Sequence, residues 1–311
     1  MANDARHRRE TVSGTRSQQR LWPVVLAAGA GRRLATITGG APKQFWRPPR
    51  GGRSLIEDTL ARVAPLDPRA HVSVVVDQAH QAYVRDVPEP WREAQWIYQP
   101  RDCGTAAGVL LALTPVLERA PDQMVLITPS DHGILDTSLF RQSMLDGAAA
   151  VTGGVAEVVV FGIQPLTSCS DYGWILPGAI CAPGMRRVIG FREKPPATEV
   201  PDLMARHALW STMVLVARAS TLRRMYETHL PNLAALFSEY RAQTTAARGA
   251  FLHAAYDTLE PADFSRDLLA RAGGLAVHVW PASMGWADLG TPERLQEWMR
   301  HPGQGGKHNA A

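Results

Sequence analysis

The sequence predicts an α/β fold, with a Rossmann-like, mostly parallel sheet that is covered by helices on both faces. Short runs rich in Val, Ile and Leu alternate with segments of helical periodicity, and 45% of the 311 residues are hydrophobic, enough for a sizeable core. Continuous apolar strands that alternate with helices are typical of a parallel sheet buried on both sides. Ligands of such sheets bind at the carboxyl ends of the strands, so we expect the functional residues in the loops that follow strands.

The strands of this sheet are expected in the first half of the chain, at 22–28, 71–77, 94–99, 124–128 and 157–163. The helices between them are expected at 54–63, 78–86, 105–119 and 137–148. Ser54 is the expected N-cap of the first helix, because a serine side chain at this position accepts a hydrogen bond from a free backbone N–H group.

A change of pattern after Ile163 predicts a second, smaller region. We expect a partly antiparallel region inserted over the sheet from three stretches rich in Gly, Pro and aromatic residues, at 172–178, 187–195 and 209–217. The fold is completed by helical sequence at 220–270, a strand at 276–281 and a last helix at 292–300. One folded domain is therefore expected over 21–300, between a disordered basic tail at 1–20 and a polar tail at 301–311.

The charge balance argues against a nucleic-acid-binding protein. The formal net charge is +4, five of the arginines lie in the first 20 residues, and no basic stripe with interleaved aromatic residues is present. No apolar run reaches the ~18 residues that a membrane-spanning helix needs. The apolar residues 21–30 follow an arginine pair, Arg8-Arg9, but the gap between them is polar and no cleavage site is present, so we expect a buried first strand there and not an export signal.

Cysteine usage indicates a reducing compartment. The three cysteines, Cys103, Cys169 and Cys181, are odd in number and form no Cys-x-x-Cys pair. A disulfide framework or a structural zinc site is therefore not expected, and we expect a cytoplasmic protein with reduced thiols.

Lysine is rare in this chain. Of 33 basic residues three are lysine, Lys43, Lys194 and Lys307, so the remaining 30 are arginine. An ammonium is a compact charge whereas a guanidinium is a planar fork, and one does not replace the other at a tight anion site. Compositional drift would also leave a few lysines, but Lys43 and Lys194 both fall inside the motifs described next.

The loop after the first strand has the composition of a phosphate-binding loop. It reads Leu26-Ala27-Ala28-Gly29-Ala30-Gly31-Arg32-Arg33-Leu34, and Pro42-Lys43-Gln44-Phe45 follows. Glycines after a strand let backbone N–H groups approach a phosphate chain, which makes candidate nucleotide contacts of Leu26, Ala28, Gly29 and Gly31. Arg33 and Lys43 would add positive charge. The loop lacks the third glycine of a dinucleotide fingerprint and the Gly-Lys-Ser/Thr of a P-loop.

These two motifs resemble the sugar-phosphate nucleotidyltransferase family, and the Pro-Lys-Gln-Phe form is similar to its mannose-1-phosphate guanylyltransferases. The resemblance extends over roughly 24–295. It implies a GT-A-like nucleotidyltransferase fold, GTP and a sugar 1-phosphate as partners, and catalytic roles for Arg33 and Lys43 at the triphosphate. Arg32 stands where the family has Thr, and Thr36 stands where Pro is common, but neither change removes a charge that the chemistry needs.

A second loop resembles the family's base-reading loop. It reads Gln99-Pro100-Arg101-Asp102-Cys103-Gly104-Thr105. The resemblance implies that Gln99 and the backbone amides of Gly104 and Thr105 contact the purine or the ribose. A plain helix start that is capped by Asp102 explains the same residues.

A carboxylate directly after the fourth predicted strand is a candidate magnesium ligand. Asp131 lies in Thr128-Pro129-Ser130-Asp131-His132, and one or two carboxylates with substrate phosphates are the usual ligands of Mg²⁺. The segment Trp286-Ala287-Asp288-Leu289-Gly290-Thr291 resembles the family's W-x-D-x-G-T element, which implies Asp288 as the second metal ligand. As an alternative, Asp288 would cap the last helix, although Thr291 suits that role better. His132 is interpreted as structural.

Three further motifs resemble the family's sugar-binding elements. Tyr172-Gly173-Trp174-Ile175 is similar to Tyr-Gly-Tyr-Ile, and Phe191-Arg192-Glu193-Lys194-Pro195 is similar to F-x-E-K-P. The resemblance implies that Gly173 and Glu193 contact the sugar and that Lys194, in a catalytic role, binds the attacking phosphate. A solvated Glu–Lys pair is the alternative. In Leu209-Trp210-Ser211-Thr212-Met213, Ser211 replaces the family's Asn at a sugar contact, which leaves the identity of the sugar open.

The resemblance implies a nucleotidyltransferase that makes GDP-mannose and pyrophosphate from GTP and mannose 1-phosphate, with Mg²⁺ as cofactor. The alternatives are the same chemistry on another sugar 1-phosphate, such as a heptose, or on another nucleotide, and a catalytically silent sensor of nucleotide sugars. A homodimer is left open. No hexapeptide-repeat pattern or isomerase-like segment follows residue 300, so a catalytic domain alone is expected.

Overall fold

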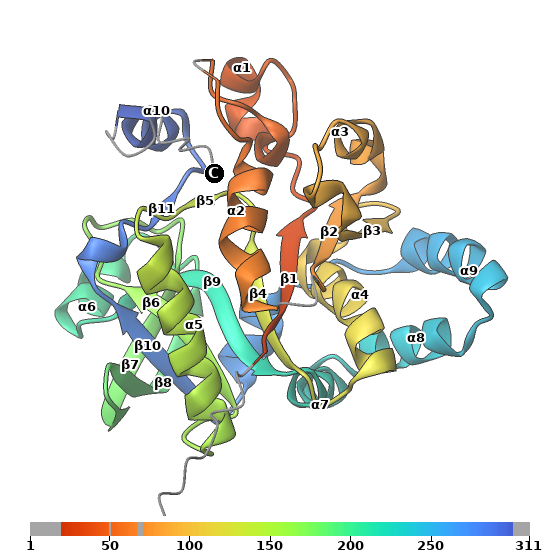
Figure 1. Ribbon diagram of the computed structural model, residues 1–311. Helices are drawn as coiled ribbons and strands as arrows, with labels where there is room; N and C mark the ends of the chain where they lie inside the picture. The colour runs from red at the N-terminus through yellow and green to blue at the C-terminus, as the bar shows by residue number, and fades with distance from the viewer. Residues whose placement is uncertain (1–19, 50, 68–70, 301–311) are drawn as a thin grey trace, which may run out of the picture.

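A large mixed sheet runs through the computed structural model, which describes residues 20–49, 51–67 and 71–300 (Figure 1). Its nine strands are β1 (Trp22–Ala27), β2 (Ser73–Asp77), β3 (Gln95–Gln99), β4 (Met124–Pro129), β6 (Val158–Ile163), β7 (Gly173–Ala182), β8 (Met185–Glu193), β9 (Leu209–Arg218) and β10 (Leu275–Trp280). Their order across the sheet is β3-β2-β1-β4-β9-β6-β10-β8-β7. A separate two-stranded ribbon pairs β5 (His132–Gly133) with β11 (Ala287–Asp288).

Seven of the nine strands run in the same direction. β1 pairs in parallel with β2 and β4, β2 with β3, and β6 with β10. β9 is antiparallel to both β4 and β6, so those two share a direction, and β8 is antiparallel to β10 and β7. The reversed strands of this sheet are therefore β8 and β9, and the predicted α/β fold with a mostly parallel sheet is confirmed.

The antiparallel strands join the main sheet instead of lying over it. β7 and β8 form a hairpin at one edge. β9 lies in the middle, between β4 and β6, because its residues 214–217 are apolar and buried, as a strand covered on both faces requires. The sugar-binding motifs predicted on these strands are thus carried by the same sheet as the predicted nucleotide loop.

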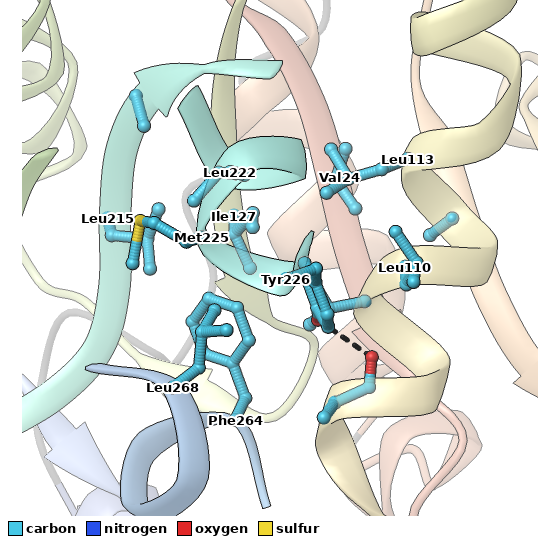
Figure 2. Close-up of a cluster of buried hydrophobic side chains, with 14 of the residues drawn as sticks. Val24, Leu110, Leu113, Ile127, Leu215, Leu222, Met225, Tyr226, Phe264 and Leu268 are labelled. Atoms are coloured by element: carbon cyan, nitrogen blue, oxygen red, sulfur yellow. Dashed lines mark hydrogen bonds between the residues drawn. The ribbon is translucent and has the colours of Figure 1, made fainter. Parts of the chain in front are cut away.

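Helices cover both faces of the sheet. α2 (Leu55–Val63) and α5 (Thr137–Thr152) lie on one face, and α4 (Gly104–Arg119) and α7 (Ala219–His229) lie on the other (Figure 1). Neighbouring strand residues point into opposite cores. Val24 packs in one core with Leu110 and Leu113 of α4 (Figure 2), whereas Val25 packs in the other with Ile56 of α2. This two-sided burial is the reason that the strands read as continuous apolar runs.

The helical sequence predicted at 220–270 is confirmed as α7, α8 (Pro231–Ala242) and α9 (Thr245–Thr258), followed by one π-helical turn at Phe264–Leu268. Pro231 begins α8, because proline lacks the N–H group that the first turn of a helix leaves unpaired. α8 and α9 project away from the sheet in Figure 1. The shorter helices are α1 (Ala35–Thr38), α3 (Gln81–Arg85), α6 (Val200–Ala205) and α10 (Pro292–Arg300).

Two local predictions need correction. Ser54 lies at the N-cap of α2, but its hydroxyl donates to Oε1 of the buried Glu57 at 2.9 Å and accepts no backbone N–H group. The helix predicted at 78–86 is a 3-10 turn at Gln78–His80 that continues into α3. Of the predicted basic tail at 1–20, residues 1–19 lie outside the described residues, and so does the predicted polar tail at 301–311. Within the described ranges, no helix is long and apolar enough to cross a bilayer.

Candidate functional site

A polar cavity of about 740 Å³ opens where β1, β2 and β4 end. This is the carboxyl edge of the parallel strands, where ligands of α/β sheets bind. Its lining includes seven residues that the sequence predicted for the nucleotide and the metal, namely Ala28, Gly29, Gly31, Arg33, Lys43, Asp131 and Asp288. It also includes residues for which the sequence predicted no contact, namely Asp77, Ala79, His80, Asp102 and Gly290. The position of Asp77 at the end of β2 was an available signal for it.

Gly31 lets the glycine loop lie directly against Lys43. Its φ of +62° is in the left-handed region, and a Cβ at this position would lie 2.7 Å from the Cβ of Lys43. Another residue type would therefore force one of the two segments to move. A 3-10 turn at Arg32–Leu34 follows and buries Leu34. The guanidinium of Arg33 then lies near Gly290, where an added Cβ would be 3.3 Å from Nη2.

Lys43 places a buried positive charge between two carboxylates. Only 5% of its side chain is exposed, and its Nζ lies 2.9 Å from Oδ2 of Asp131 and 3.8 Å from Oδ1 of Asp288. The neighbouring Gln44 anchors this turn, because its Nε2 donates to the carbonyl oxygen of Ala27 at 2.6 Å. A buried charge is tolerated when it is paired in this way, and the pairing ties the turn at Lys43–Phe45 to both acidic residues.

Asp131 follows β4 and keeps a third of its side chain exposed, at 33%. Burial acts to raise the pKa of Asp131, but the charge of Lys43, with further contributions from His132 and the Lys43 hydrogen bond, outweighs it and lowers the pKa. The carboxylate is therefore ionised at neutral pH, which is the state that a cation or a phosphate-binding lysine requires.

The small ribbon of β5 and β11 brings Asp288 to Asp131. Asp288 is paired in register with His132, the residue after Asp131, although the two segments are far apart in the chain. Trp286 supports the ribbon, since its Nε1 donates to Nδ1 of His132 at 3.2 Å. The interpretation of His132 as structural stays a prediction. The ribbon lies between α2 and α10 at the upper edge of the sheet (Figure 1).

Arg294, in α10, contacts Asp288 from the other side. Its Nη1 donates to Oδ2 of Asp288 at 2.9 Å, and its guanidinium lies 4.8 Å from the ring centroid of Tyr172. Burial acts to lower the pKa of Arg294, but Tyr172 and Asp288 outweigh it and raise the pKa. Sequence reasoning missed this residue, because an arginine in a polar helix after the W-x-D-x-G-T segment carries no signal of its own. The helix itself begins at Pro292, and Oγ1 of the preceding residue, Thr291, accepts from the Arg294 N–H group at 3.4 Å.

Asp131 and Asp288 offer carboxylate oxygens, the type of ligand that a hard divalent cation prefers. Asp131 and Asp288 both face the Lys43 ammonium, so this part of the cavity already holds a positive charge between them. No cluster of three or more His, Cys, Asp and Glu side chains suited to a metal is found among residues 20–49, 51–67 and 71–300. A pair of carboxylates is the donor set that Mg²⁺ takes when water and substrate phosphates complete its shell.

The predicted base-reading loop is held by internal hydrogen bonds. Gly104 has a φ of +81°, and a Cβ there would lie 2.3 Å from the carbonyl oxygen of Ala262. The Gly104 N–H group donates to Oδ1 of Asp102 at 2.9 Å, and the Thr105 hydroxyl accepts from the Phe264 N–H group at 2.8 Å. The N-cap position of α4 is Cys103, which makes no side-chain cap, so the alternative interpretation of Asp102 as the N-cap needs correction: Asp102 lies one residue earlier. Asp102 is the residue of this loop that lines the cavity.

Gln99, Gly104 and Thr105 lie beside the cavity rather than in its lining. Gln99 ends β3 with 2% of its surface exposed, and its Oε1 would lie 3.1 Å from a Cβ at Gly108 of α4. The first turn of α4 is further fixed by Tyr226, whose hydroxyl donates to the carbonyl oxygen of Ala106 at 2.7 Å (dashed in Figure 2). Leu26, within β1, is also absent from the lining formed by described residues. Their predicted contacts to the nucleotide stay predictions.

The predicted sugar-binding residues come together on β7, β8 and β9. Gly173 is paired with Glu193, and a Cβ at Gly173 would lie 2.7 Å from Oε2 of that glutamate. Glu193 is 14% exposed and pairs with Lys194 at 3.3 Å. Burial raises the pKa of Glu193 more than the charge of Lys194 lowers it. Lys194 is 64% exposed and has a φ of +44°, an unfavourable conformation for a residue with a side chain.

Ser211 lies next to this group, one residue beyond the pairing of Trp174 with Trp210. Its hydroxyl accepts from the Met213 N–H group at 3.3 Å, across a backbone turn in which Met213 has a φ of +56°. The serine therefore supports a local bend of β9, a role that the sequence did not suggest.

Tyr172 connects the predicted sugar-binding residues to the cavity. Its ring centroid lies 4.4 Å from that of Trp210 and 5.9 Å from that of Trp286. Arg294 covers the same ring and binds Asp288, so one continuous set of contacts runs from β9 to the carboxylate in the cavity. The arrangement places the glycine loop, two carboxylates and the predicted sugar-binding residues along one edge of the sheet.

Known proteins with similar sequences carry related functions in their names. The chain is 28% identical over 298 residues to a protein named xanthan biosynthesis protein XanB from Xanthomonas campestris pv. campestris (strain B100), with 92% of this chain and 61% of that protein covered. It is 27% identical to a mannose-1-phosphate guanylyltransferase of Sinorhizobium fredii (strain NBRC 101917 / NGR234), with 86% of this chain and 53% of that enzyme covered. The chain thus spans little more than half to three fifths of the length of these relatives.

The fold and the family agree with this likeness. The crystal structure of a protein named mannose-1-phosphate geranyltransferase, from Thermus thermophilus, matches with a TM-score of 0.78 over 91% of this chain and 80% of that one, at 24% identity. That identity supports the fold. The sequence profile of the family described as nucleotidyl transferase matches residues 22–304. The chain therefore belongs to the nucleotidyl transferase family.

Proposed function

We propose that this chain transfers the guanylyl group of GTP to mannose 1-phosphate and releases pyrophosphate. The observation that carries the proposal is the meeting of the glycine loop, the buried Lys43 and the carboxylates of Asp131 and Asp288 at one cavity. The relative named mannose-1-phosphate guanylyltransferase supports the choice of GTP and mannose.

The proposed reaction is an in-line displacement at phosphorus. A phosphate oxygen of mannose 1-phosphate forms a bond to the α-phosphorus of GTP, and the bond from that phosphorus to the pyrophosphate oxygen breaks. The attacking oxygen is ionised near neutral pH, so no general base is needed. The protein then contributes through alignment and through stabilisation of the developing negative charge.

Lys43 and Arg33 are the groups proposed to meet the triphosphate. Gly31 and Gly290 bring both side chains close to Asp288, so an α-phosphate held over the glycine loop would lie within reach of two positive charges. The loop itself offers backbone N–H groups that no side chain shields, because a Cβ added at Gly29 would have no neighbouring atom within 4 Å.

Asp131 and Asp288 are proposed to hold Mg²⁺. When bound there, Mg²⁺ neutralises negative charge on the phosphate oxygens of the nucleotide. The two carboxylates supply hard oxygen ligands from the ends of β4 and β11, and Lys43 keeps them facing each other.

Gly173, Glu193 and Lys194 are proposed to hold mannose 1-phosphate. The missing Cβ of Gly173 leaves room beside the Glu193 carboxylate, which accepts hydrogen bonds from sugar hydroxyls when ionised. The exposed ammonium of Lys194 would bind the phosphate. We include a cytoplasmic location in the proposal, supported by three unpaired cysteines.

The direct test is incubation of the protein with GTP, MgCl₂ and mannose 1-phosphate, with detection of pyrophosphate. A panel of nucleoside triphosphates and sugar 1-phosphates, including a heptose 1-phosphate, would identify the preferred pair. The expected result is the highest kcat/KM with GTP and mannose 1-phosphate. Preferred turnover of a different pair would contradict the proposed substrates and support the proposed reaction type. Tight binding of GDP-mannose without turnover of any pair would contradict the proposed activity and indicate a sensor of nucleotide sugars.

A further inference from the structure

Arg294 lies between the carboxylate side and the sugar side of the site. Besides its bond to Asp288 and its position over Tyr172, its Nη2 donates to Sγ of Cys169 at 3.4 Å. A quarter of the side chain, 25%, is exposed. Three different partners therefore fix both the position and the plane of this guanidinium.

The two oxygens of Asp288 face different cations. Oδ2 accepts from Arg294 at 2.9 Å, while Oδ1 lies 3.8 Å from Nζ of Lys43. The carboxylate is consequently held with Oδ1 turned toward the side of Lys43 and Asp131. Backbone support at this point is small, because β11 consists of two residues, Ala287–Asp288.

We infer that Arg294 is a positioning residue, which orients the Asp288 carboxylate and thereby sets the affinity of the site for a divalent cation. The inference rests on the proposed function for the presence of that cation. A guanidinium suits this task because its donors form a rigid fork and its face stacks on Tyr172, whereas an ammonium has neither property. In this role Arg294 acts through Asp288 and is not a ligand of the cation.

The charge of Arg294 and its orienting effect should change the metal affinity in opposite directions, so the two can be distinguished by experiment. A positive charge beside Asp288 repels a divalent cation, so removing that charge would tighten metal binding if charge were its only effect. If orientation dominates, removal loosens binding. Replacing Arg294 by Lys keeps the charge and loses the fork, and replacing it by Met loses both. Arg206→Lys is the matched control, since Arg206 is 51% exposed and pairs with Asp202 on α6, at 3.6 Å.

The experiment measures Mn²⁺ binding to the full chain by electron paramagnetic resonance. It is carried out once with the protein alone and once with GTP present, in both cases without a sugar phosphate. The expected result is affinity at least about tenfold weaker in both Arg294→Lys and Arg294→Met, with unchanged affinity in Arg206→Lys. The thermal unfolding midpoint should stay close to that of the wild type. Unchanged affinity in both Arg294 variants, or tighter binding in Arg294→Met, would overturn the inference, and so would absence of Mn²⁺ binding by the wild type.

A second variant tests the route through the aromatic ring. Tyr172→Leu keeps an apolar side chain and removes the platform under the guanidinium, so it should weaken Mn²⁺ binding in the same direction. Combined with Arg294→Met, it should add little, because both changes remove one support of Asp288. If the losses of Mn²⁺ affinity in the two single variants add up in the double variant, Tyr172 acts independently of Arg294, and a role for Tyr172 through Arg294 is overturned. If Mn²⁺ binding shifts as expected while the wild type makes no nucleotide sugar, the proposed reaction fails and the positioning role of Arg294 stands.

Discussion

The ammonium of Lys43 lies 2.9 Å from Oδ2 of Asp131, and 5% of the lysine side chain is exposed. This pair joins the turn at Lys43–Phe45 to the loop that follows β4. It also explains why the chain keeps a lysine here although almost all its basic residues are arginine. The space around the ammonium is narrow, since its Nζ also lies 3.8 Å from Oδ1 of Asp288. A compact charge fits this space and a wide fork does not.

Lys43→Arg should therefore raise the KM for GTP by at least about tenfold, which corresponds to ~1.4 kcal/mol of binding free energy. The physical reason is that the planar guanidinium cannot replace the ammonium between Asp131 and Asp288. Steady-state kinetics with varied GTP measures the effect. Lys307→Arg makes the same chemical change outside the described residues and serves as the control.

Lys194→Arg provides the contrast, because Lys194 is exposed and pairs with Glu193. In this variant the KM for mannose 1-phosphate should change more than the KM for GTP. If the KM for GTP of Lys43→Arg equals that of the wild type, any positive charge serves at position 43.

Asp288→Asn should lower turnover at least about tenfold, or ~1.4 kcal/mol in the activation barrier, and leave the fold intact. The amide removes one negative ligand from the proposed metal site but keeps an oxygen that accepts from Arg294. Turnover with varied MgCl₂ and circular dichroism measure the two effects. Asp202→Asn, at an exposed position on α6, controls for loss of a carboxylate. Full activity of Asp288→Asn, or of the wild type in EDTA, contradicts the metal assignment.

Gly31→Ala should lower the thermal unfolding midpoint, because its φ is +62° and the new Cβ would collide with Lys43. Strain at a left-handed position costs roughly 1 kcal/mol or more. Gly29→Ala in the same loop is the matched control for stability, since its Cβ would have no neighbour within 4 Å. Calorimetry of both variants without ligand measures the difference. Equal midpoints would mean that the loop moves away from Lys43 without cost.

Glu193→Gln should change stability in a pH-dependent way. Burial raises the pKa of Glu193, so the folded protein binds this proton more tightly than the unfolded chain does. The stabilising contribution of Glu193 is thus fully present below its unfolded pKa and is lost as the pH rises through the raised value. Relative to the wild type, the neutral glutamine variant should be more stable at about pH 7.5 than at about pH 4.

Urea unfolding at both pH values measures that difference, and Glu199→Gln, at an exposed position on the approach to α6, controls for the lost charge. At the higher pH the variant should also have a raised KM for mannose 1-phosphate, because an amide accepts fewer hydrogen bonds from sugar hydroxyls than a carboxylate does. A stability difference that does not vary with pH would show that Glu193 titrates as an exposed group.

The strands and the glycine loop were predictable because their signals are local. Buried strands such as β2 and β4 read as unbroken apolar runs, and Gly29 and Gly31 follow β1 directly. The pairing of β9 between β4 and β6 was not predictable from the pattern, since the same apolar run suits an edge hairpin or a central strand. That choice depends on which helices cover the strand, which is decided by contacts distant in sequence.

The acidic pair shows the same limit within the site. The place of Asp131 at the cavity was predictable because it comes after a strand. The proximity of Asp288 depends on a ribbon of two-residue strands, which are too short to show a periodic pattern in the sequence. Arg294 could be found only after that ribbon and α10 were placed. The hydrogen bond from Phe264 to Thr105 was also hidden, because these two residues lie far apart in sequence, whereas the one from Gly104 to Asp102 is local.

Ser211 is the position where the sugar preference should be adjustable. Its hydroxyl already accepts from the Met213 N–H group at 3.3 Å, so it has less capacity to bind a sugar hydroxyl than an asparagine amide would have. An unpaired buried polar group costs ~1–3 kcal/mol. Discrimination between sugars that differ at the hydroxyl facing Ser211 would therefore be weaker by one to two orders of magnitude. The wild type should therefore use an epimeric or larger sugar 1-phosphate measurably beside mannose 1-phosphate.

Ser211→Asn should narrow this preference toward mannose 1-phosphate. An asparagine side chain can still accept from the N–H group two residues on, which preserves the turn at Met213, and its amide adds a donor toward the sugar. The ratio of kcat/KM for mannose 1-phosphate to that for glucose 1-phosphate and a heptose 1-phosphate measures the change. Ser211→Ala is the companion variant, because it removes the hydroxyl without adding a donor and should leave the ratio low. Strict use of mannose 1-phosphate by the wild type, with the same ratio in both variants, would mean that the sugar is read elsewhere, with Glu193 and Gly173 as the nearest candidates.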